Sequence, residues 1–188
     1  MPISPDSDES IPTKQRQEFT AMTMRVLDEQ WQQDNPLDVV EEIVTANEWP
    51  FDRQGDDELS VSITGGWCDY HLGFSFCAEQ GGMQLACAYD MKVPNNRMRD
   101  VHTLLAHINE RMWLGHFDLW SDDAIPMYRN GVLLRENEVP RSRHMEELIE
   151  IAITECERYY PAFQFVIWGG KSPSEAVAAA MLDTVGEA

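Results

Sequence analysis

Three stretches of alternating apolar and polar residues follow one another between residues 59 and 90, separated only by short turns. Alternation with a period of two puts every second side chain on the same face of a β-strand. Turns this short join antiparallel neighbours, because a parallel connection needs a crossover of about a dozen residues or more. The segment therefore predicts an antiparallel meander with one buried face. Its apolar positions are Leu59, Val61 and Ile63, then Tyr70, Leu72, Phe74 and Phe76, then Met83, Leu85, Cys87 and Tyr89.

Segments with helical periodicity flank this meander. A first helix is expected to start at Pro36, because Asn35 can cap it and proline suits the first helical position. Trp49-Pro50 is expected to end it, since the residue before a proline disfavours helical backbone. A second helix is expected to start at Pro94 and to end at Gly115, because apolar residues recur between them at helical spacing.

Two more strands and a third helix follow. The strands are expected to open at Phe117 and at Ile125, and Asn130-Gly131 within the second of them favours a bulge or a bend. The third helix is expected over 140–160. The expected order of elements along the chain is therefore helix, three strands, helix, two strands, helix. This order predicts a single α+β domain, with a five-stranded antiparallel sheet and three main helices.

The two ends of the chain differ in composition. Residues 1–34 are polar, with seven acids and three bases, and predict a disordered acidic tail. Residues 35–188 are expected to form the α+β domain. Pro161 is expected to end the third helix, so that a C-terminal extension begins at about residue 161. Within it, Ser172-Pro173-Ser174-Glu175 is a capping box that predicts a short alanine-rich helix to about Leu182.

The charge balance limits the classes of partner. The chain carries 33 acidic and 14 basic residues, a net charge of -19. Nucleic acids and anionic membrane surfaces are therefore disfavoured as partners. We find no signal-peptide pattern near Met1 and no apolar run of about 20 residues, which a bilayer span would need. We expect a cytoplasmic protein whose four cysteines are reduced.

Metal and catalytic motifs are missing from the sequence. Cys68 and His71 stand three residues apart, a spacing that puts them on opposite faces of a strand. His102 and His107 stand five apart, whereas metal-binding pairs on a helix usually stand about four apart. No motif for a nucleophile, a phosphate loop or a dinucleotide accompanies them. We therefore expect no enzyme activity, no cofactor and no metal site.

Several sequence segments together resemble the YbjN family of bacterial sensory-transduction regulators, over residues 36–175. The resemblance implies the fold of type III secretion chaperones, small α+β proteins that often dimerise and hold client proteins. It supplies no catalytic residues. It implies a non-catalytic regulator or chaperone-like adaptor that acts by protein–protein contact. The segments that carry it are Trp67-Cys68-Asp69-Tyr70, Trp113-Leu114-Gly115-His116-Phe117-Asp118 and Tyr159-Tyr160-Pro161-Ala162-Phe163.

Two tryptophans are expected outside the core. Trp67 falls at a turn, and Trp120 shares a strand face with His116, opposite the face of Phe117. Partly exposed aromatic rings beside polar residues are common anchors of protein interfaces. If helices cover one face of the sheet, the other face is free for a partner, and a homodimer is one such assembly. Trp67, His116 and Trp120 are thus candidate protein-binding residues.

Four arginines lie at expected helix starts, Arg97 and Arg99 in the second helix and Arg141 and Arg143 in the third. A cation there opposes the helix dipole by roughly 0.3–1 kcal/mol. A bound anion would reverse that cost, so an alternative function is a small-anion sensor that uses these helix ends. The other explanation is that these arginines form ion pairs with the abundant carboxylates. The sequence does not decide between an anion site and such ion pairs.

Overall fold

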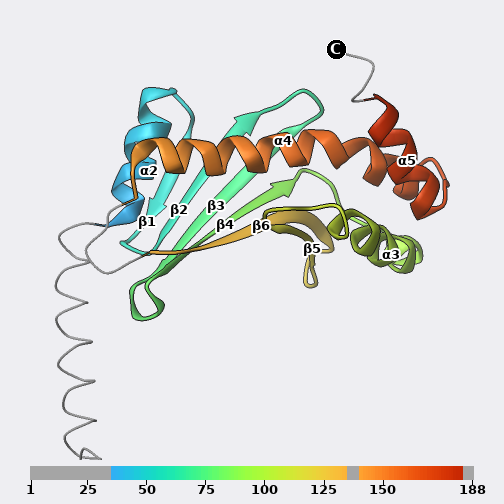
Figure 1. The fold of residues 1–188 in the computed structure, drawn as a ribbon, viewed down its shortest axis with the longest axis horizontal. Coiled ribbons are helices and arrows are strands. Elements are labelled where there is room, and N and C mark those ends of the chain that lie inside the picture. The colour runs from blue at the N-terminus through green and yellow to red at the C-terminus, as the bar shows by residue number, and fades with distance from the viewer. Residues whose placement is uncertain (1–34, 135–139, 184–188) are drawn as a thin grey trace, which may run out of the picture.

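The computed structural model describes residues 35–134 and 140–183, which form one antiparallel sheet with helices packed on it (Figure 1). The expected tail over 1–34 lies outside the described residues. The sheet has six strands in the order β1-β2-β3-β4-β6-β5. The strands are β1 (Phe51–Gln54), β2 (Glu58–Thr64), β3 (Asp69–Cys77), β4 (Gly82–Tyr89), β5 (His116–Trp120) and β6 (Ile125–Leu133). The α-helices are α2 (Pro36–Ala46), α3 (Met98–Asn109), α4 (Ser142–Ile167) and α5 (Pro173–Asp183).

The predicted meander is present as β2, β3 and β4, with β3 paired antiparallel to both neighbours. After β4 the chain forms α3 and returns as the hairpin of β5 and β6. In this hairpin β6 lies against β4, and β5 becomes an outer strand. Residues 82–88 of β4 pair one for one with residues 127–133 of β6. A bulge or a bend was expected at Asn130-Gly131. The bulge is wrong, because unbroken pairing with β4 leaves no extra residue in β6, whereas the bend stays a prediction.

The sheet has one strand more than the five expected. The additional strand, β1, has four residues and pairs with β2 at the edge of the sheet. Most of its side chains are exposed, so its sequence shows no alternation from which burial could be inferred. Arg53 of β1 forms ion pairs with Asp38 and Glu41 of α2, at 2.7 and 2.6 Å. Backbone pairing and these ion pairs hold β1 in place without an apolar pattern.

The predicted start of α2 is confirmed. The Leu37 N–H donates to the Asn35 side chain at 2.8 Å, and Pro36 occupies the first turn. The Asn35 amide also donates to the Asp56 carbonyl, at 2.5 Å. This second bond fixes the point where the chain enters the domain, beside the turn between β1 and β2. The helix ends at Ala46, earlier than expected.

The longest helix, α4, continues through Pro161, where we expected a helix end. An interior proline costs a helix about 3 kcal/mol. Here the residues on both sides of it are buried, among them Tyr160 and Phe163. Packing against the sheet outweighs the local cost, and the helix ends only at Ile167. The predicted capping box at the start of α5 is present, with the Glu175 carboxylate accepting a hydrogen bond from the Ser172 N–H at 3.1 Å.

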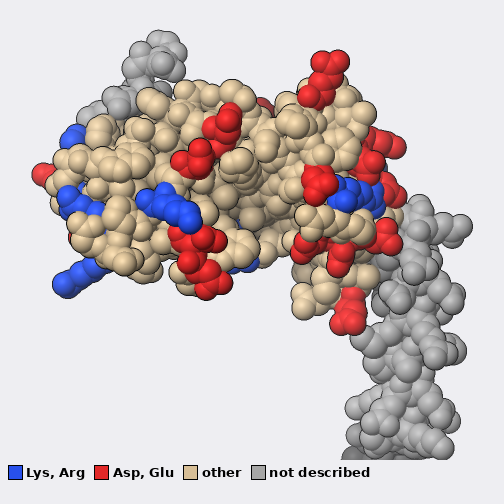
Figure 2. Space-filling model, turned by 180° about the vertical axis from the view of Figure 1, so that it is seen from behind, with Lys and Arg blue, Asp and Glu red and all other residues tan. Residues whose placement is uncertain are grey.

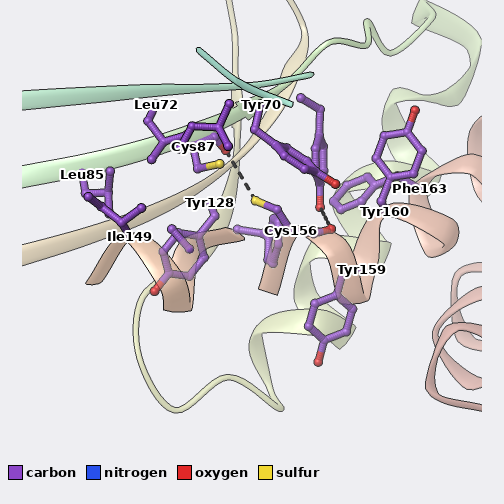
Figure 3. Close-up of a cluster of buried hydrophobic side chains, with 14 of the residues drawn as sticks. Tyr70, Leu72, Leu85, Cys87, Tyr128, Ile149, Cys156, Tyr159, Tyr160 and Phe163 are labelled. Atoms are coloured by element: carbon purple, nitrogen blue, oxygen red, sulfur yellow. Dashed lines mark hydrogen bonds between the residues drawn. The ribbon is translucent and has the colours of Figure 1, made fainter. Parts of the chain in front are cut away.

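Aromatic rings fill the space between the sheet and α4 (Figure 3). Tyr89 lies at the centre of this cluster, and its hydroxyl donates to the Cys156 carbonyl of α4 at 2.9 Å. Burial raises the pKa of the Tyr89 hydroxyl well above its ordinary value. The cluster therefore joins α4 to the middle of the sheet. The rings around Tyr89 are Tyr70, Phe117, Tyr160 and Phe163, with centroid distances from 5.3 to 6.2 Å.

The helices of the described residues lie on one face of this sheet. In Figure 1, α4 runs across the strands, with α2 near one end and α3 and α5 near the other. Burial along the strands follows this arrangement: Tyr70 and Leu72 of β3 are buried, whereas His71 and Ser75 are exposed. The sheet thus has a core face under the helices. It also has an opposite face, called the open face below, on which none of the described helices packs.

Candidate functional site: the open face of the sheet

Small residues occupy much of the middle of the open face, next to the longer side chains of Glu58, Gln84 and Arg129. The strand register places them in neighbouring rows across the sheet. A Cβ atom added at Gly73 or Gly131 would meet no other atom within 4 Å, which means that the space above both residues is empty. The open face is therefore hollow at its centre. The rows are Ser60, Gly73, Ala86 and Arg129, and next to it Glu58, Ser75, Gln84 and Gly131.

A groove of about 290 Å³ occupies this hollow. It extends from Gln54 and Glu58 on β1 and β2, past Gly73 and Ala86, to Trp120 on β5. Figure 2 shows this side of the molecule: its middle is hollowed, and acidic and basic side chains lie around the hollow. One acid, Glu58, and one base, Arg129, line the groove, so its lining has no net charge in a chain of net charge -19.

The β5 end of the groove is apolar. Both Trp120 and Met127 line it. Trp120 is 55% exposed, whereas Met127 is only 4% exposed, although it lies on the open face and apart from the main core cluster. A buried methionine beside a half-exposed tryptophan offers apolar contact area with little loss of side-chain entropy. This end of the groove can therefore anchor an apolar side chain of a partner.

An ion pair lies next to Trp120 and Met127 at this end of the groove. The Arg129 guanidinium donates to the Asp118 carboxylate at 3.1 Å and to the Gln84 side-chain oxygen at 2.8 Å. Burial alone would raise the pKa of Asp118, but the Leu119 N–H and Arg129 lower it below its ordinary value. Asp118 and Arg129 thus neutralise each other, and the groove gains no net charge from them.

The candidate protein-binding residues separate into two places. His116 and Trp120 both lie on the open face, at the two ends of β5, with three register pairs between them. Trp67 is 53% exposed, but its ring stacks on Tyr160 of α4, at 5.9 Å between centroids. Trp67 therefore lies on the helix side of the sheet. The structure places His116 and Trp120 on the same face but at opposite ends of β5, and it places Trp67 on the other side of the sheet. Their role in binding remains a prediction.

The four arginines do not converge on one site. Arg97 and Arg99 lie at the start of α3, and Arg141 and Arg143 at the start of α4, at the other end of the molecule (Figure 1). Arg97 pairs with a carboxylate of its own helix, Asp100, at 3.3 Å. Arg143 does the same with Glu147 at 3.0 Å. Carboxylate pairing accounts for these two residues, and no observation favours an anion there.

The sequence did not allow us to predict the residues at the centre of the groove or at its β5 end. Gly73 and Ala86 lie on the polar side of their strands. Two such small residues at polar positions could have predicted a hollow on that face of the sheet. Met127 and Arg129 gave no such signal, because the register of β6 against β4 decides which face they occupy. Only the three-dimensional pairing places them beside Trp120.

Neither a metal centre nor a membrane span is found in the part of the chain that the structure describes. Over residues 35–134 and 140–183, no three side chains of His, Cys, Asp or Glu are grouped as metal ligands. No helix in these ranges combines the length and the apolar character that a bilayer crossing requires.

Comparison with known proteins gives the family. The sequence profile of YbjN, described as "Putative bacterial sensory transduction regulator", matches residues 36–165. The chain belongs to the YbjN family. Among solved structures, it is similar to the one titled "Crystal structure of YbjN, a putative transcription regulator from E. coli", with 9% identity and a TM-score of 0.47. That likeness covers 63% of this chain and 84% of the other. No functionally curated protein matches the chain.

Proposed function

We propose that this protein is a regulator without catalytic activity that binds another protein through the open face of its sheet. The observation that carries the proposal is the groove, in which the exposed ring of Trp120 lies beside a hollow whose middle holds Gly73 and Ala86. The family description, that of a regulator, supports the regulatory and non-catalytic part. We further propose that the protein contacts another protein through this face and that it does so in the cytoplasm.

The charge distribution favours a binding surface over a merely solvated face. One face of an antiparallel sheet can meet water, but such faces usually carry many charged side chains. In this chain, the acids and bases lie mostly away from the middle of the open face (Figure 2). A partner would then gain affinity from covering Trp120 and Met127, as at other interfaces with a central aromatic anchor. Exposed ion pairs would add little.

A site-specific photo-crosslinker in the native host tests this proposal. The photoreactive residue replaces Trp120 in one strain and Trp168 in another, because Trp168 at the end of α4 is similarly exposed, at 61%. We expect covalent adducts with another protein at position 120 and none at position 168. Equal adducts at both positions, or none at position 120, would contradict the proposal.

Self-association belongs to the same proposal, since the resemblance to secretion chaperones implies dimers. If the open face also joins two copies, the molar mass in solution is that of a dimer at high protein concentration. Replacement of Trp120 by serine should then restore the mass of a monomer, whereas replacement of Trp168 should not. Light scattering coupled to size-exclusion chromatography measures both. A monomer at every concentration would remove self-association from the proposal and leave the contact with another protein.

A further inference from the structure

We propose that the outer edge of β1 binds an extended segment of another protein that carries lysine or arginine side chains. The segment would add a strand to the sheet, beside a cleft that lies between β1 and α2. This edge is separate from the groove of the open face, and its test does not involve Trp120. The proposed function and this inference can therefore fail independently of each other.

The two edges of the sheet differ in how their backbone groups are satisfied. At the β5 edge, the Asn109 side chain of α3 accepts a hydrogen bond from the Phe117 N–H at 2.8 Å and donates one to the Phe117 carbonyl at 3.0 Å. The next outward N–H, that of Leu119, donates to the Asp118 carboxylate at 2.8 Å. Side chains thus take the place of a neighbouring strand, and they close the β5 edge to an added one.

In the described ranges, the β1 edge has no such partners. The Ser62 N–H donates to the Pro50 carbonyl at 3.0 Å, and residue pairs in an antiparallel ladder alternate between hydrogen-bonded and non-hydrogen-bonded. The N–H and C=O groups of Phe51 and Arg53 therefore point away from β2 and out of the sheet. No residue that the structure describes forms a hydrogen bond with these four groups. Such a row of groups is a template for an extended chain.

A cleft of about 610 Å³ adjoins this edge on the helix side of the sheet. Its lining consists of Arg53 from β1 and of residues from α2. The Arg53 side chain crosses it to Asp38 and Glu41, which are both in α2. Paired residues of neighbouring antiparallel strands place their side chains on the same face of a sheet. Every second side chain of a strand added to β1 would therefore lie over this cleft.

The charges in the cleft favour a basic side chain. The lining holds three carboxylates, Asp38, Glu41 and Glu42, and one guanidinium, Arg53. Arg53 pairs with Asp38 and Glu41, and Glu42 has no ion pair among the described residues. A lysine or arginine of the added strand would meet this excess of negative charge, whereas an acidic segment would be repelled. The free backbone groups thus select an extended chain, and the cleft selects its charge.

A second copy of the chain fits this edge less well. In antiparallel pairing of two β1 strands, all four free groups are used only if Phe51 of each copy lies opposite Arg53 of the other. The two Asp52 side chains would then lie directly opposite each other. Like charges in this position destabilise a strand pair. We therefore assign the edge to a basic segment of a different protein.

The test uses the full chain and a heptapeptide of alternating valine and lysine, with a heptapeptide of alternating valine and glutamate as its control. Amide hydrogen exchange, followed by NMR, detects pairing at Phe51 and Arg53. Glu42→Lys reverses a charge in the cleft. Asp122→Lys makes the same change in the turn between β5 and β6, at the opposite edge of the sheet. Both residues are exposed, so both variants should fold.

We expect the lysine peptide to slow exchange at Phe51 and Arg53 by about tenfold or more, because their amides become hydrogen-bonded. It should leave Phe117 unchanged, and the glutamate peptide should slow none of the three. Glu42→Lys should weaken binding of the lysine peptide by about tenfold or more. Asp122→Lys should weaken it by less than about twofold, because this residue lies farther away than the screening length.

Three results would overturn the inference. The first is no binding of the lysine peptide, or binding that leaves exchange at Phe51 and Arg53 unchanged. The second is an equal effect of the two variants, which would show that only the overall charge of the chain matters. The third is slow exchange at these two amides in the free chain. If that protection increased with protein concentration, it would assign the edge to a second copy.

Discussion

The two faces of the sheet are built from the same strands and have opposite compositions. The core face presents tyrosine, phenylalanine and leucine to α4, and its largest side chains are almost completely buried. The open face presents glycine, alanine, serine and one half-exposed tryptophan above a hollow. Because burial of apolar area drives folding, the core face must supply most of the stability. The open face contributes little, which leaves it free to bind.

This division also explains where the charges lie. A net charge of -19 would oppose most apolar contacts between molecules if it were spread evenly. On the open face, Arg129 pairs with Asp118, and the lining of the groove contains one acid, Glu58, and one base, Arg129. The lining of the groove therefore has no net charge, in contrast to the chain as a whole.

Removal of a core ring should have the largest effect. Phe163 is completely buried in the aromatic cluster. We expect Phe163→Ala to lower the free energy of unfolding by about 3–5 kcal/mol, because it removes apolar contacts and leaves a cavity. Trp120→Ser on the open face should lower it by less than about 1 kcal/mol, as for other surface changes. Urea unfolding measures both. Similar losses in the two variants would contradict the division between the faces.

A pair of glycine substitutions makes the same comparison at the backbone. Gly115 has a φ of +65°, and an added Cβ would lie 2.4 Å from the Tyr128 ring. We expect Gly115→Ala to lower the free energy of unfolding by about 1–3 kcal/mol. Gly73→Ala on the open face meets empty space, and should be neutral or stabilising by up to about 1 kcal/mol. Thermal unfolding monitored by circular dichroism gives both values, and destabilisation by Gly73→Ala would show that the open face is packed.

Alkaline pH should weaken the core face selectively. Burial raises the pKa of Tyr128 from 10.0 to about 12. The unfolded chain therefore releases this proton at a lower pH than the folded chain does. The stabilisation is fully present below pH 10 and is lost as the pH rises from 10 to about 12. Tyrosinate absorbance should rise together with the loss of the circular dichroism signal. Ionisation of all five tyrosines near pH 10, with the fold retained, would be the contrary result.

A single buried hydroxyl should have a smaller effect. The Tyr89 hydroxyl donates to the Cys156 carbonyl of α4. We expect Tyr89→Phe to lower the free energy of unfolding by about 1 kcal/mol, because the ring remains and only one hydrogen bond is lost. Urea unfolding with an unchanged m-value would confirm that the fold is the same. A loss as large as that of Phe163→Ala would mean that the hydroxyl, rather than the ring packing, holds α4 in place.

Local signals predicted the parts of the fold that depend on nearest neighbours. The meander followed from the alternation of Leu59 to Tyr89, and the start of α2 followed from Asn35 and Pro36. Elements that depend on distant contacts were missed. β1 is held by pairing with β2, and α4 passes Pro161 because of packing on the sheet.

The candidate site divides in the same way. The exposure of Trp120 and its place on the same face as His116 followed from the period of the strand. The groove did not, because it requires Gly73, Ala86 and Met127 to meet across three strands. Trp67 was placed with Trp120 by its turn position alone, and its stacking on Tyr160 puts it on the other side of the sheet.

The central claim is that the open face binds a partner while the core face maintains the fold. Affinity capture from the native host, quantified by mass spectrometry, tests it with the full chain and with Trp120→Ser and Trp168→Ser. We expect a protein that is enriched by the wild type and by Trp168→Ser, and that falls by about tenfold or more with Trp120→Ser, as for an interface anchor. All three chains should unfold at similar urea concentrations. Retention of the protein by Trp120→Ser, equal loss with Trp168→Ser, or no reproducible enrichment at all would contradict the claim.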